Sequence, residues 1–327
     1  MKYHYVCWGK DYEYNKYCYG ELNKDSNSEY IENDLSSNSK FINLIYKIHT
    51  SIKTNSILKL PFKKIWFKSM CNFKRVKDKN YCFVFLLSTS HFYALEYGFG
   101  TYLKKKFPGS KLVCYYDDLV NCYEKNVSVD FIKKTFDLVL SFDKADCSNY
   151  GFIYHQLVYS PLNLSFNNNP NYDICFIGRA KNRIETILGC YDYFIKNNLK
   201  CNFNIIGISD IEVKNKYPNI NFCERISYSD NLKIIMDSRV ILEVMQRGGS
   251  GYTLRTCEAI MTNRKLLTNN KDVAVEPFYH GNIMAFENPS DIDLSFIRNG
   301  LPHYDKKTKD NISPLEMINK IEKLLEA

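Results

Sequence analysis

Short apolar runs alternate with segments of helical spacing along most of the chain. A run of about four to eight apolar residues is typical of a buried strand, whereas apolar residues three or four positions apart are typical of a helix. In the first half this pattern predicts strands at 3–8, 82–87, 111–116, 137–142 and 153–159 and helices at 91–107 and 128–136. Strands that alternate with helices indicate an α/β fold with parallel sheets and right-handed crossovers.

The same alternation resumes near residue 173 and predicts a second α/β unit. Its strands are expected at 173–179, 201–207, 219–223, 240–244 and 265–268, and its helices at 182–196, 229–238 and 252–262. Residues 161–172 are rich in asparagine and proline, which favours an interdomain linker. The prediction is therefore an N-terminal domain at 1–160, a second domain at 173–311 and a C-terminal helix within 312–327. A chain of 327 residues is long enough to form two such cores.

Three segments of the first half do not follow the alternation. Residues 21–40 are polar and rich in serine, asparagine and aspartate, which predicts a loop or mobile segment. Between residues 41 and 48, apolar positions recur at helical spacing. Residues 59–79 carry eight lysines and arginines against a single acid, Asp78, with these apolar side chains between them: Phe62, Ile65, Trp66, Phe67, Met70 and Phe73.

The basic and aromatic composition of residues 59–79 is typical of a segment that lies on an anionic membrane surface. The alternative is an amphipathic helix that packs its apolar side on its own domain and leaves solvated lysines outside. A nucleic-acid partner is not expected, because no RNP, helix-turn-helix or zinc motif accompanies the basic segment.

The overall composition is that of a globular protein, with 45% hydrophobic residues, 24% charged residues and a net charge of +8. No run reaches the ~18 apolar residues of a membrane-spanning helix, and the first residues turn polar too soon for a signal peptide. The 12 cysteines form no CxxC pair, so free thiols in a reducing compartment are expected. These features predict a cytoplasmic location.

A glycine-rich turn leads from the predicted strand at 240–244 into the predicted helix at 252–262. Three of the 14 glycines fall within four positions here, so the backbone can turn sharply and approach a ligand. The first amides of a helix have no partner inside it and favour an anion. Candidate phosphate-binding residues are therefore Gly249, Ser250, Gly251, Tyr252 and Thr253.

Two charged side chains of this helix are further candidates. Arg255 lies one turn into the helix and offers a fork of donors for a phosphate. Glu258 follows three positions later on the same side and is able to accept hydrogen bonds from a ribose diol. The alternative is an ordinary glycine-rich turn, with Glu258 as a solvated helix residue.

Arg179 gives a second indication of an anion site. It stands at the carboxyl end of a predicted strand, where ligands of open α/β sheets bind. Lys181 and Arg183 are further candidates on the same loop, and Arg225 and Ile226, after another strand, are candidates to lie against a nucleotide base. The alternative for Arg179 is a surface cation at a helix start, which the helix dipole disfavours.

The two segments Phe-Ile-Gly-Arg-Ala-Lys-Asn-Arg (176–183) and Ser-Gly-Tyr-Thr-Leu-Arg-Thr-Cys-Glu-Ala (250–259), in this order, resemble GT-B glycosyltransferases. Within that group they are most similar to bacterial enzymes of lipopolysaccharide and capsule assembly. The resemblance covers about residues 173–270 and extends to the N-terminal half only as general topology.

The resemblance implies two Rossmann-like domains that face each other across a cleft. It implies a nucleotide-diphospho-sugar donor, with a UDP-sugar favoured, on the C-terminal domain and an acceptor on the N-terminal domain. The expected reaction moves the sugar to a hydroxyl of a lipid-linked or glycan acceptor in surface polysaccharide assembly. Together with the basic segment 59–79, this places the protein peripherally on the inner face of the cytoplasmic membrane.

One position departs from the family pattern. Retaining enzymes often carry a glutamate eight positions before the ribose-binding one, and Ser250 stands there, which leaves the stereochemical outcome open. An inverting enzyme needs a general base from the acceptor side. Asp118 and Asp11 are the preferred candidates, ahead of Asp117 and His91, because they stand just beyond strand ends; capping is the alternative for each.

No metal or other cofactor is expected. The acids at 291 and 293 have the spacing of a metal-binding DxD motif, but they stand at a helix start, where capping is favoured. An alternative to the enzyme is a non-catalytic relative that binds a nucleotide or a glycan in an assembly. A Rossmann oxidoreductase is disfavoured, because no GxGxxG follows the first strand.

Overall fold

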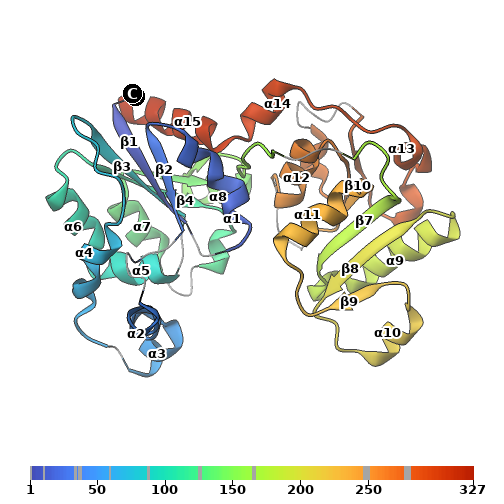
Figure 1. The fold of residues 1–327 in the computed structure, drawn as a ribbon, viewed down its shortest axis with the longest axis horizontal. Coiled ribbons are helices and arrows are strands. Elements are labelled where there is room, and N and C mark those ends of the chain that lie inside the picture. Colours follow the sequence, from blue (N-terminus) through green and yellow to red (C-terminus); the bar gives the residue numbers. More distant parts are fainter. Residues whose placement is uncertain are drawn as a thin grey trace. The chain divides into compact units, whose positions relative to one another are not determined.

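The computed structural model describes residues 2–9, 12–32, 35, 39–58, 60–86, 89–123, 127–163, 167–245, 251–275 and 281–327. The chain divides into two compact units: Met1–Ser160 together with Ser313–Ala327, and Pro161–Ile312. Each unit contains a six-stranded parallel sheet with helices packed around it (Figure 1). The predicted α/β fold with two Rossmann-like domains is therefore confirmed.

The sheet of the first unit has the strand order β2-β1-β3-β4-β5-β6. Its strands are β1 (Tyr3–Trp8), β2 (Ser28–Ile31), β3 (Asn80–Leu86), β4 (Lys111–Tyr116), β5 (Leu138–Ser141) and β6 (Ile153–Tyr154). Its helices are α1 (Asn15–Tyr19), α2 (Lys40–Thr50), α3 (Ile52–Ile57), α4 (Phe67–Met70), α5 (Thr89–Glu96), α6 (Phe99–Lys106), α7 (Val129–Thr135), α8 (Lys144–Tyr150) and α15 (Pro314–Glu326). Three 3-10 turns are η1 (Gly20–Lys24), η2 (Lys63–Trp66) and η3 (Val120–Cys122).

Aromatic side chains fill the core of the first unit. Trp8 stacks on Phe83 and packs on Phe85, with ring centroids 5.3 and 5.0 Å away. Every residue of β1 is buried, and so is every residue of β3 after its first. A sheet covered on both faces buries the side chains of both faces, which explains why these strands are continuous apolar runs.

The sheet of the second unit has the strand order β12-β11-β10-β7-β8-β9. Its strands are β7 (Tyr172–Arg179), β8 (Cys201–Ile206), β9 (Asn221–Cys223), β10 (Ser238–Glu243), β11 (Lys265–Thr268) and β12 (Ile283–Ala285). Its helices are α9 (Ile184–Lys196), α10 (Ile211–Lys216), α11 (Tyr228–Met236), α12 (Leu254–Thr262), α13 (Leu294–Arg298) and α14 (Lys306–Asn311). Three 3-10 turns are η4 (Lys181–Arg183), η5 (Lys271–Val275) and η6 (Pro289–Asp291).

The loop predicted at 21–40 contains a strand that the sequence pattern did not indicate. Within this segment η1 is followed by β2, which pairs in parallel with β1. Glu29 of β2 is buried, and its carboxylate is hydrogen-bonded to His4 Nε2 and to the backbone amide of Lys74, each at 2.9 Å. These partners compensate the cost of placing a carboxylate inside the fold, so a polar residue can occupy a buried strand.

The basic segment 59–79 divides its apolar side chains between the core and the surface. Phe67, Met70 and Phe73 are buried in the core, as the alternative interpretation of this segment expected. Phe62 and Ile65 are exposed. The helix predicted at 91–107 is also divided, into α5 and α6, because the chain takes a left-handed conformation at Gly98 with φ 96°.

The C-terminal helix α15 belongs to the first unit, and hydrogen bonds at both of its ends hold it there (Figure 1). Ser313 donates to Glu21 Oε2 at 2.6 Å, and Glu322 Oε1 accepts from the amide of Lys2 at 2.8 Å. Between them, Lys320 Nζ donates to the carbonyl of Tyr154 at 2.7 Å. All 12 cysteines are free thiols, and no helix of the described residues is long and apolar enough to span a bilayer.

The buried His155 makes the stability of the first unit depend on pH. Burial, helped by the charge of Lys320, lowers the pKa of His155 to about 3, below the value of about 6.5 in the unfolded chain. The unfolded state therefore binds more protons between these values, so stability falls as the pH falls. Between about pH 6.5 and pH 5 we expect wild type to lose roughly 2 kcal/mol more unfolding free energy than His155→Gln. Urea denaturation at both pH values measures this difference, and equal losses in the two proteins would contradict it.

Candidate functional site

The carboxyl ends of β7 and β10 and the start of α12 meet at one edge of the second sheet. The two strands are parallel neighbours, so they end at the same edge. The guanidinium of Arg183 joins the strand ends, because it donates to the carbonyls of Arg179 and Val244. Arg255, in the first turn of α12, donates from Nη2 to the carbonyl of Ile177 in β7 at 3.0 Å. Ligands of open α/β sheets bind at this kind of edge.

The turn into α12 ends at Gly251, whose φ of 84° lies in the left-handed region that favours glycine. Asn270 Nδ2 donates to the carbonyl of Gly251 at 2.8 Å, and Asn269 Oδ1 accepts from the amide of Met245 at 2.6 Å. Side chains that follow β11 therefore bind the described residues on either side of this segment, Met245 and Gly251. Gly249 and Ser250 lie outside the described residues.

The start of α12 is capped by its own threonines. Thr253 Oγ1 accepts from the amides of Arg255 and Thr256 at 3.1 and 3.3 Å. The hydroxyl of Thr256 in turn accepts from the amide of Thr253, which completes a capping box. The amides of Thr253, Arg255 and Thr256, at the helix start where an anion site was predicted, are thus hydrogen-bonded within the protein.

Glu243, at the end of β10, holds this cap in place. Its carboxylate accepts from the hydroxyl of Thr253 and from Thr268 Oγ1, the latter at 2.5 Å. Burial raises the pKa of Glu243, whereas the two hydroxyls and the positive charges of Arg255 and Arg183 act in the opposite direction. The carboxylate therefore connects β10, β11 and the first turn of α12.

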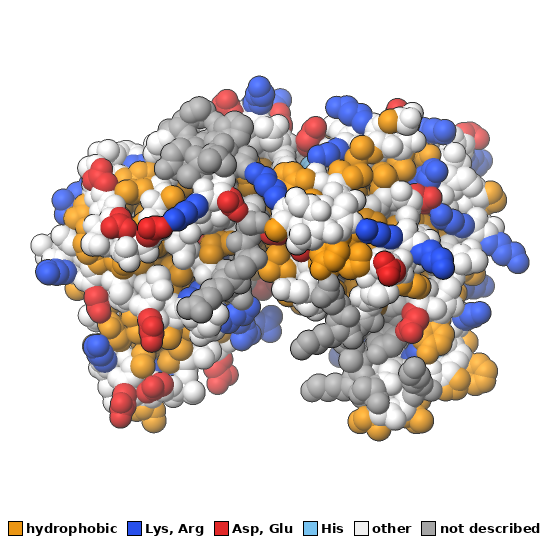
Figure 2. Space-filling view, turned by 180° about the vertical axis from the view of Figure 1, so that it is seen from behind, with side chains coloured by type: hydrophobic (Ala, Val, Ile, Leu, Met, Phe, Trp, Pro, Cys, Tyr) orange, Lys and Arg blue, Asp and Glu red, His pale blue; other side chains and the backbone are white. Residues whose placement is uncertain are grey.

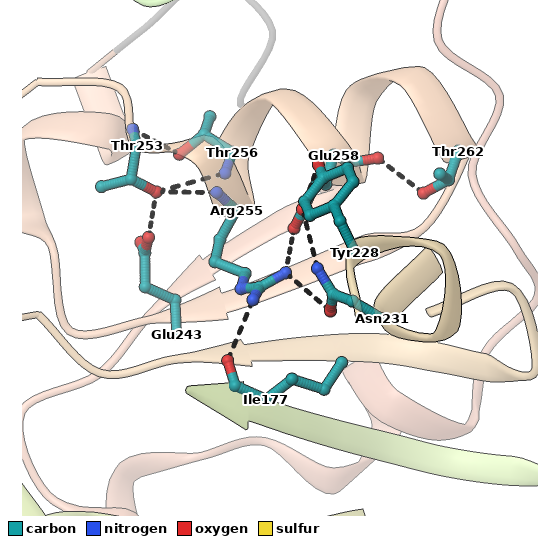
Figure 3. A network of polar contacts seen from close by, with 9 residues as sticks. All are labelled: Ile177, Tyr228, Asn231, Glu243, Thr253, Arg255, Thr256, Glu258 and Thr262. Atoms are coloured by element: carbon teal, nitrogen blue, oxygen red, sulfur yellow. Dashed lines mark hydrogen bonds and ion pairs between the residues drawn. The ribbon is translucent and has the colours of Figure 1, made fainter. Parts of the chain in front are cut away.

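Arg255 and Glu258 form an ion pair on the side of α12 that faces the sheet and α11 (Figure 3). Arg255 Nη1 also donates to Asn231 Oδ1 of α11 at 3.2 Å. Glu258 Oε1 accepts from the hydroxyl of Tyr228 at 2.6 Å and from Asn231 Nδ2 at 3.3 Å. The side chain of Glu258 is 0% exposed, so these groups are its surroundings.

This network bears on the roles predicted for the two residues. The guanidinium of Arg255 and the carboxylate of Glu258 bind each other, α11 and β7. The side chain of Arg255 is 20% exposed, whereas that of Glu258 is 0% exposed, so a ribose could reach Glu258 only if its surroundings moved. The binding roles of Arg255 and Glu258 stay predictions, whereas their part in holding the elements together is visible in the contacts.

Two exposed cations stand at the carboxyl end of β7: Arg179, its last residue, and Lys181, two positions later. Lys181 has φ 46°, in the left-handed region that a residue with a side chain seldom adopts. An outlier of this kind is often found at functional sites. Arg183 is half-buried and donates to main-chain carbonyls, so among the three predicted cations it acts as a clamp between the strands.

The segment predicted to lie against a base connects β9 to α11. Arg225 is exposed and Ile226 half-buried, and Ser227 then caps α11 by accepting from the amide of Asp230 at 3.0 Å. Tyr228, the next residue, reaches Glu258. The segment is therefore joined to the network around α12, which brings most of the predicted donor-binding residues into one part of the second unit. Tyr252 is buried beside them.

Asp117 and Asp118 follow β4 at the carboxyl edge of the first sheet. Asp118 is exposed, and its Oδ1 accepts from the amide of Leu119 at 2.9 Å, which is a turn contact. His91 is buried, and its Nδ1 lies 3.1 Å from the carbonyl of Leu86. Asp11 lies outside the described residues, and the proposed base therefore stays a prediction.

The acids of the DxD spacing cap two helices of the second unit. Asp291 Oδ2 accepts from the amide of Asn288 at 2.8 Å, and Asp293 Oδ1 accepts from the amide of Ser295 at 2.8 Å. The predicted capping role of these two acids is confirmed. Among the described residues no group of three histidines, cysteines or acids is placed to hold a metal ion.

Sequence reasoning missed the residues that orient this edge, namely Glu243, Tyr228, Asn231 and Thr268. Glu243 did carry a signal, because it is the lone charged residue in an otherwise apolar strand run. Tyr228 and Asn231 are three positions apart on the helix α11, so they share a face. Nothing in the sequence pairs that face with Glu258.

Comparison with known proteins shows which solved structures share this fold. No protein-family model and no curated protein sequence matches the chain. It is similar to a solved alpha-glucosyltransferase in complex with UDP-glucose and DNA containing an abasic site, with TM-score 0.56, 12% identity, and 91% of this chain and 90% of that chain covered. For an alpha-glucosyltransferase in complex with UDP and a 13-mer DNA containing a HMU base, the TM-score is 0.50, the identity 11% and the coverage 90% and 89%.

The solved structure of TarM has TM-score 0.49 and 13% identity, and the match covers 78% of this chain and 56% of TarM. The chain thus spans little more than half the length of TarM. At these identities the likeness establishes the fold alone. The expected resemblance to GT-B glycosyltransferases is confirmed at that level, with each unit carrying a Rossmann-like parallel sheet.

Removal of Glu258 tests the structural part of the network. Because Glu258→Ala leaves the guanidinium of Arg255 without its carboxylate, we expect the unfolding free energy of the second unit to fall by about 3–5 kcal/mol. Urea denaturation measures this loss, and Arg255→Met combined with Glu258→Met should recover part of it. As a matched control, Asp230→Asn breaks an exposed pair with Lys233 at the same i,i+3 spacing and should leave the midpoint unchanged. An equally small effect of Glu258→Ala would show that the pair is not needed for folding.

Proposed function

We propose that the protein is a glycosyltransferase that uses a nucleotide-diphospho-sugar, with a UDP-sugar as donor. The observation that carries the proposal is the edge of the second sheet, where β7 ends at Arg179, Lys181 follows two positions later, and Gly251 leads into α12. The solved structures of the same fold contain UDP-glucose and UDP in alpha-glucosyltransferases, which supports this class of donor.

In such a transfer, the bond between the anomeric carbon of the sugar and the diphosphate oxygen breaks. The acceptor hydroxyl oxygen forms the new bond to that carbon and gives its proton to a base, while the nucleoside diphosphate leaves with the bonding electrons. Negative charge therefore grows on the diphosphate, and fixed cations stabilise it. Arg179 and Lys181 are the cations we assign to this task, because both are exposed at the carboxyl edge of the sheet, whereas Arg183 and Arg255 are half-buried.

The remaining assignments are further parts of this proposal. Gly249, Ser250 and Gly251 to Thr253 lie near the diphosphate, Arg225 and Ile226 near the base, and Glu258 at the ribose. We assign the acceptor to the first unit, with Asp118 or Asp11 as the base that takes its proton. The acceptor would be a lipid-linked sugar or a glycan in surface polysaccharide assembly, and the exposed Lys64 and Lys68 of the basic segment support work at an anionic membrane.

Lys181 offers a sharp test, because its side chain should favour UDP binding whereas its left-handed backbone should lower the stability of the fold. Lys181→Gly removes the cation and also relieves the left-handed backbone, so UDP binding should weaken about tenfold while the unfolding free energy is kept or raised. Arg179→Gln should weaken UDP binding by a similar factor. Calorimetry with UDP and urea denaturation measure the two effects.

Lys200→Gln is the matched control, because Lys200 is an exposed cation directly before β8, at the amino edge of the same sheet. It should leave UDP affinity unchanged. Equal affinities of wild type, Lys181→Gly and Arg179→Gln would remove the assignment of this edge to the donor. UDP binding without hydrolysis or transfer across a panel of UDP-sugars would instead favour a non-catalytic binding module.

A further inference from the structure

The exposed apolar side chains of the protein are concentrated in one part of the first unit. Of the twelve large hydrophobic residues that are exposed in the described chain, nine lie between residues 41 and 65. They are Phe41, Ile42, Leu44, Ile45, Ile48, Ile57, Leu58, Phe62 and Ile65. Seven of the nine are aliphatic. We call the surface that they form over α2, α3 and η2 the α2–α3 surface.

Figure 2 shows hydrophobic side chains at the lower right, the end of the first unit where Figure 1 places α2 and α3. Two side chains of this surface are especially exposed, Ile57 at 89% and Phe62 at 77%. Single exposed hydrophobic residues are normal on a protein surface, but a contiguous group of them marks a site of interaction.

Polar side chains are buried inside the same segment and apolar ones are exposed. A protein in water ordinarily has the opposite arrangement. Lys63 is 3% exposed, and its ammonium donates to the carbonyl of His49 and to Asn55 Oδ1, both at 2.6 Å. Asn55 is also buried and donates to the carbonyls of His49 and Ser51 at 3.0 and 2.7 Å. Polar groups thus hold α2, α3 and η2 together from inside, while the nine hydrophobic side chains named above are exposed.

Hydrogen bonds also fix the shape of this segment. The indole of Trp66, which is only a donor, donates to His49 Nδ1 at 2.7 Å, so the other ring nitrogen of His49 carries the proton and donates to the carbonyl of Pro61 at 2.6 Å. Tyr46, the buried residue of α2, packs edge-on against Trp66. These hydrogen bonds and ring contacts therefore fix the backbone that carries the outward side chains.

The charge of this region is as uneven as its hydrophobicity. Residues 35–77 contain ten of the 44 lysines and arginines and none of the 36 acids. The rest of the chain then has 34 cations against 36 acids, so the whole positive net charge belongs to residues 35–77. Lys40, Lys47, Lys64 and Lys68 of this region are exposed around the apolar side chains.

We propose that the α2–α3 surface docks on the surface of an anionic lipid bilayer, with its apolar side chains among the acyl chains and its lysines at the headgroups. A bilayer supplies both an apolar layer and a layer of negative charge next to it. A second copy of this chain would place the exposed lysines of this acid-free region against the same lysines, which opposes self-association. Nucleic acid would match the lysines but offers no partner for seven aliphatic side chains.

This surface differs from the segment 59–79 that the sequence indicated. The apolar anchors come chiefly from α2 and α3, whereas much of 67–73 packs in the core. The inference does not rest on the proposed sugar transfer, and its test uses neither nucleotide nor sugar.

The test is flotation of the full chain with vesicles of equimolar phosphatidylcholine and phosphatidylglycerol, and with vesicles of phosphatidylcholine alone. An apolar variant carries Phe41→Ser, Leu44→Ser, Ile48→Ser, Ile57→Ser and Phe62→Ser. A charge variant carries Lys40→Gln, Lys47→Gln and Lys64→Gln. The matched control carries Ile195→Ser and Ile211→Ser, which are exposed isoleucines of the second unit.

Wild type should float with the anionic vesicles and much less with the neutral ones. The apolar variant should partition at least tenfold less, the charge variant should lose the preference for phosphatidylglycerol, and the control should behave as wild type. Because all substituted residues are exposed, circular dichroism and thermal unfolding should be unchanged in every variant.

Three results would overturn the proposal. The first is equal flotation of wild type and the apolar variant. The second is a concentration-dependent dimer in sedimentation velocity that the apolar variant abolishes, without vesicle binding by wild type. The third is tight binding of a duplex oligonucleotide together with absence of flotation. Calorimetry with UDP on the same proteins reports on the proposed function separately.

Discussion

The enclosed ion pair between Arg255 and Glu258 is the interaction on which the carboxyl edge of the second sheet depends. A carboxylate with no exposed surface is stable only when a positive charge and hydrogen bonds replace the water it has lost. Glu258 obtains them from Arg255, Tyr228 and Asn231, and Arg255 donates further hydrogen bonds to Asn231 and Ile177. Satisfying one buried charge therefore fixes α12, α11 and β7 relative to one another.

This pairing divides the charged residues of the edge into two groups. Arg255 and Arg183 donate hydrogen bonds to protein oxygens, and Glu243 accepts one from Thr253 at the start of α12. These residues therefore determine where the start of α12 and the strand ends lie. Arg179 and Lys181 stand outside this framework on the surface. An anion that approaches the edge meets these two cations first, while the charge of Arg255 is already balanced by Glu258.

Sequence patterns predicted those features that depend on local physics. Continuous apolar runs identified the strands buried on both faces, and clustered glycines identified the turn that needs a left-handed residue at 251. They did not identify β2, because Glu29 interrupts its apolar character and is compensated by His4, 25 positions away. The enclosure of Glu258 was missed for the same reason, since Tyr228 and Asn231 lie 30 and 27 positions before it. Long-range compensation of polar groups leaves no local pattern.

The buried Lys63 of the first unit is satisfied without a carboxylate, as are the buried Arg264 and Lys265 of the second unit. Lys63 hydrogen-bonds to a carbonyl and an amide oxygen, and burial lowers its pKa, although the charge of Glu96 acts in the opposite direction. A carboxylate placed within residues 35–77 would balance Lys63 better, yet the segment contains none. A carboxylate near Lys63 would stabilise its charge, but on the outer side of the segment it would be repelled by an anionic surface. The segment thus has an apolar exterior without acids, and polar groups are buried inside it. This arrangement is consistent with an outer neighbour that is negatively charged at its surface and apolar below that surface.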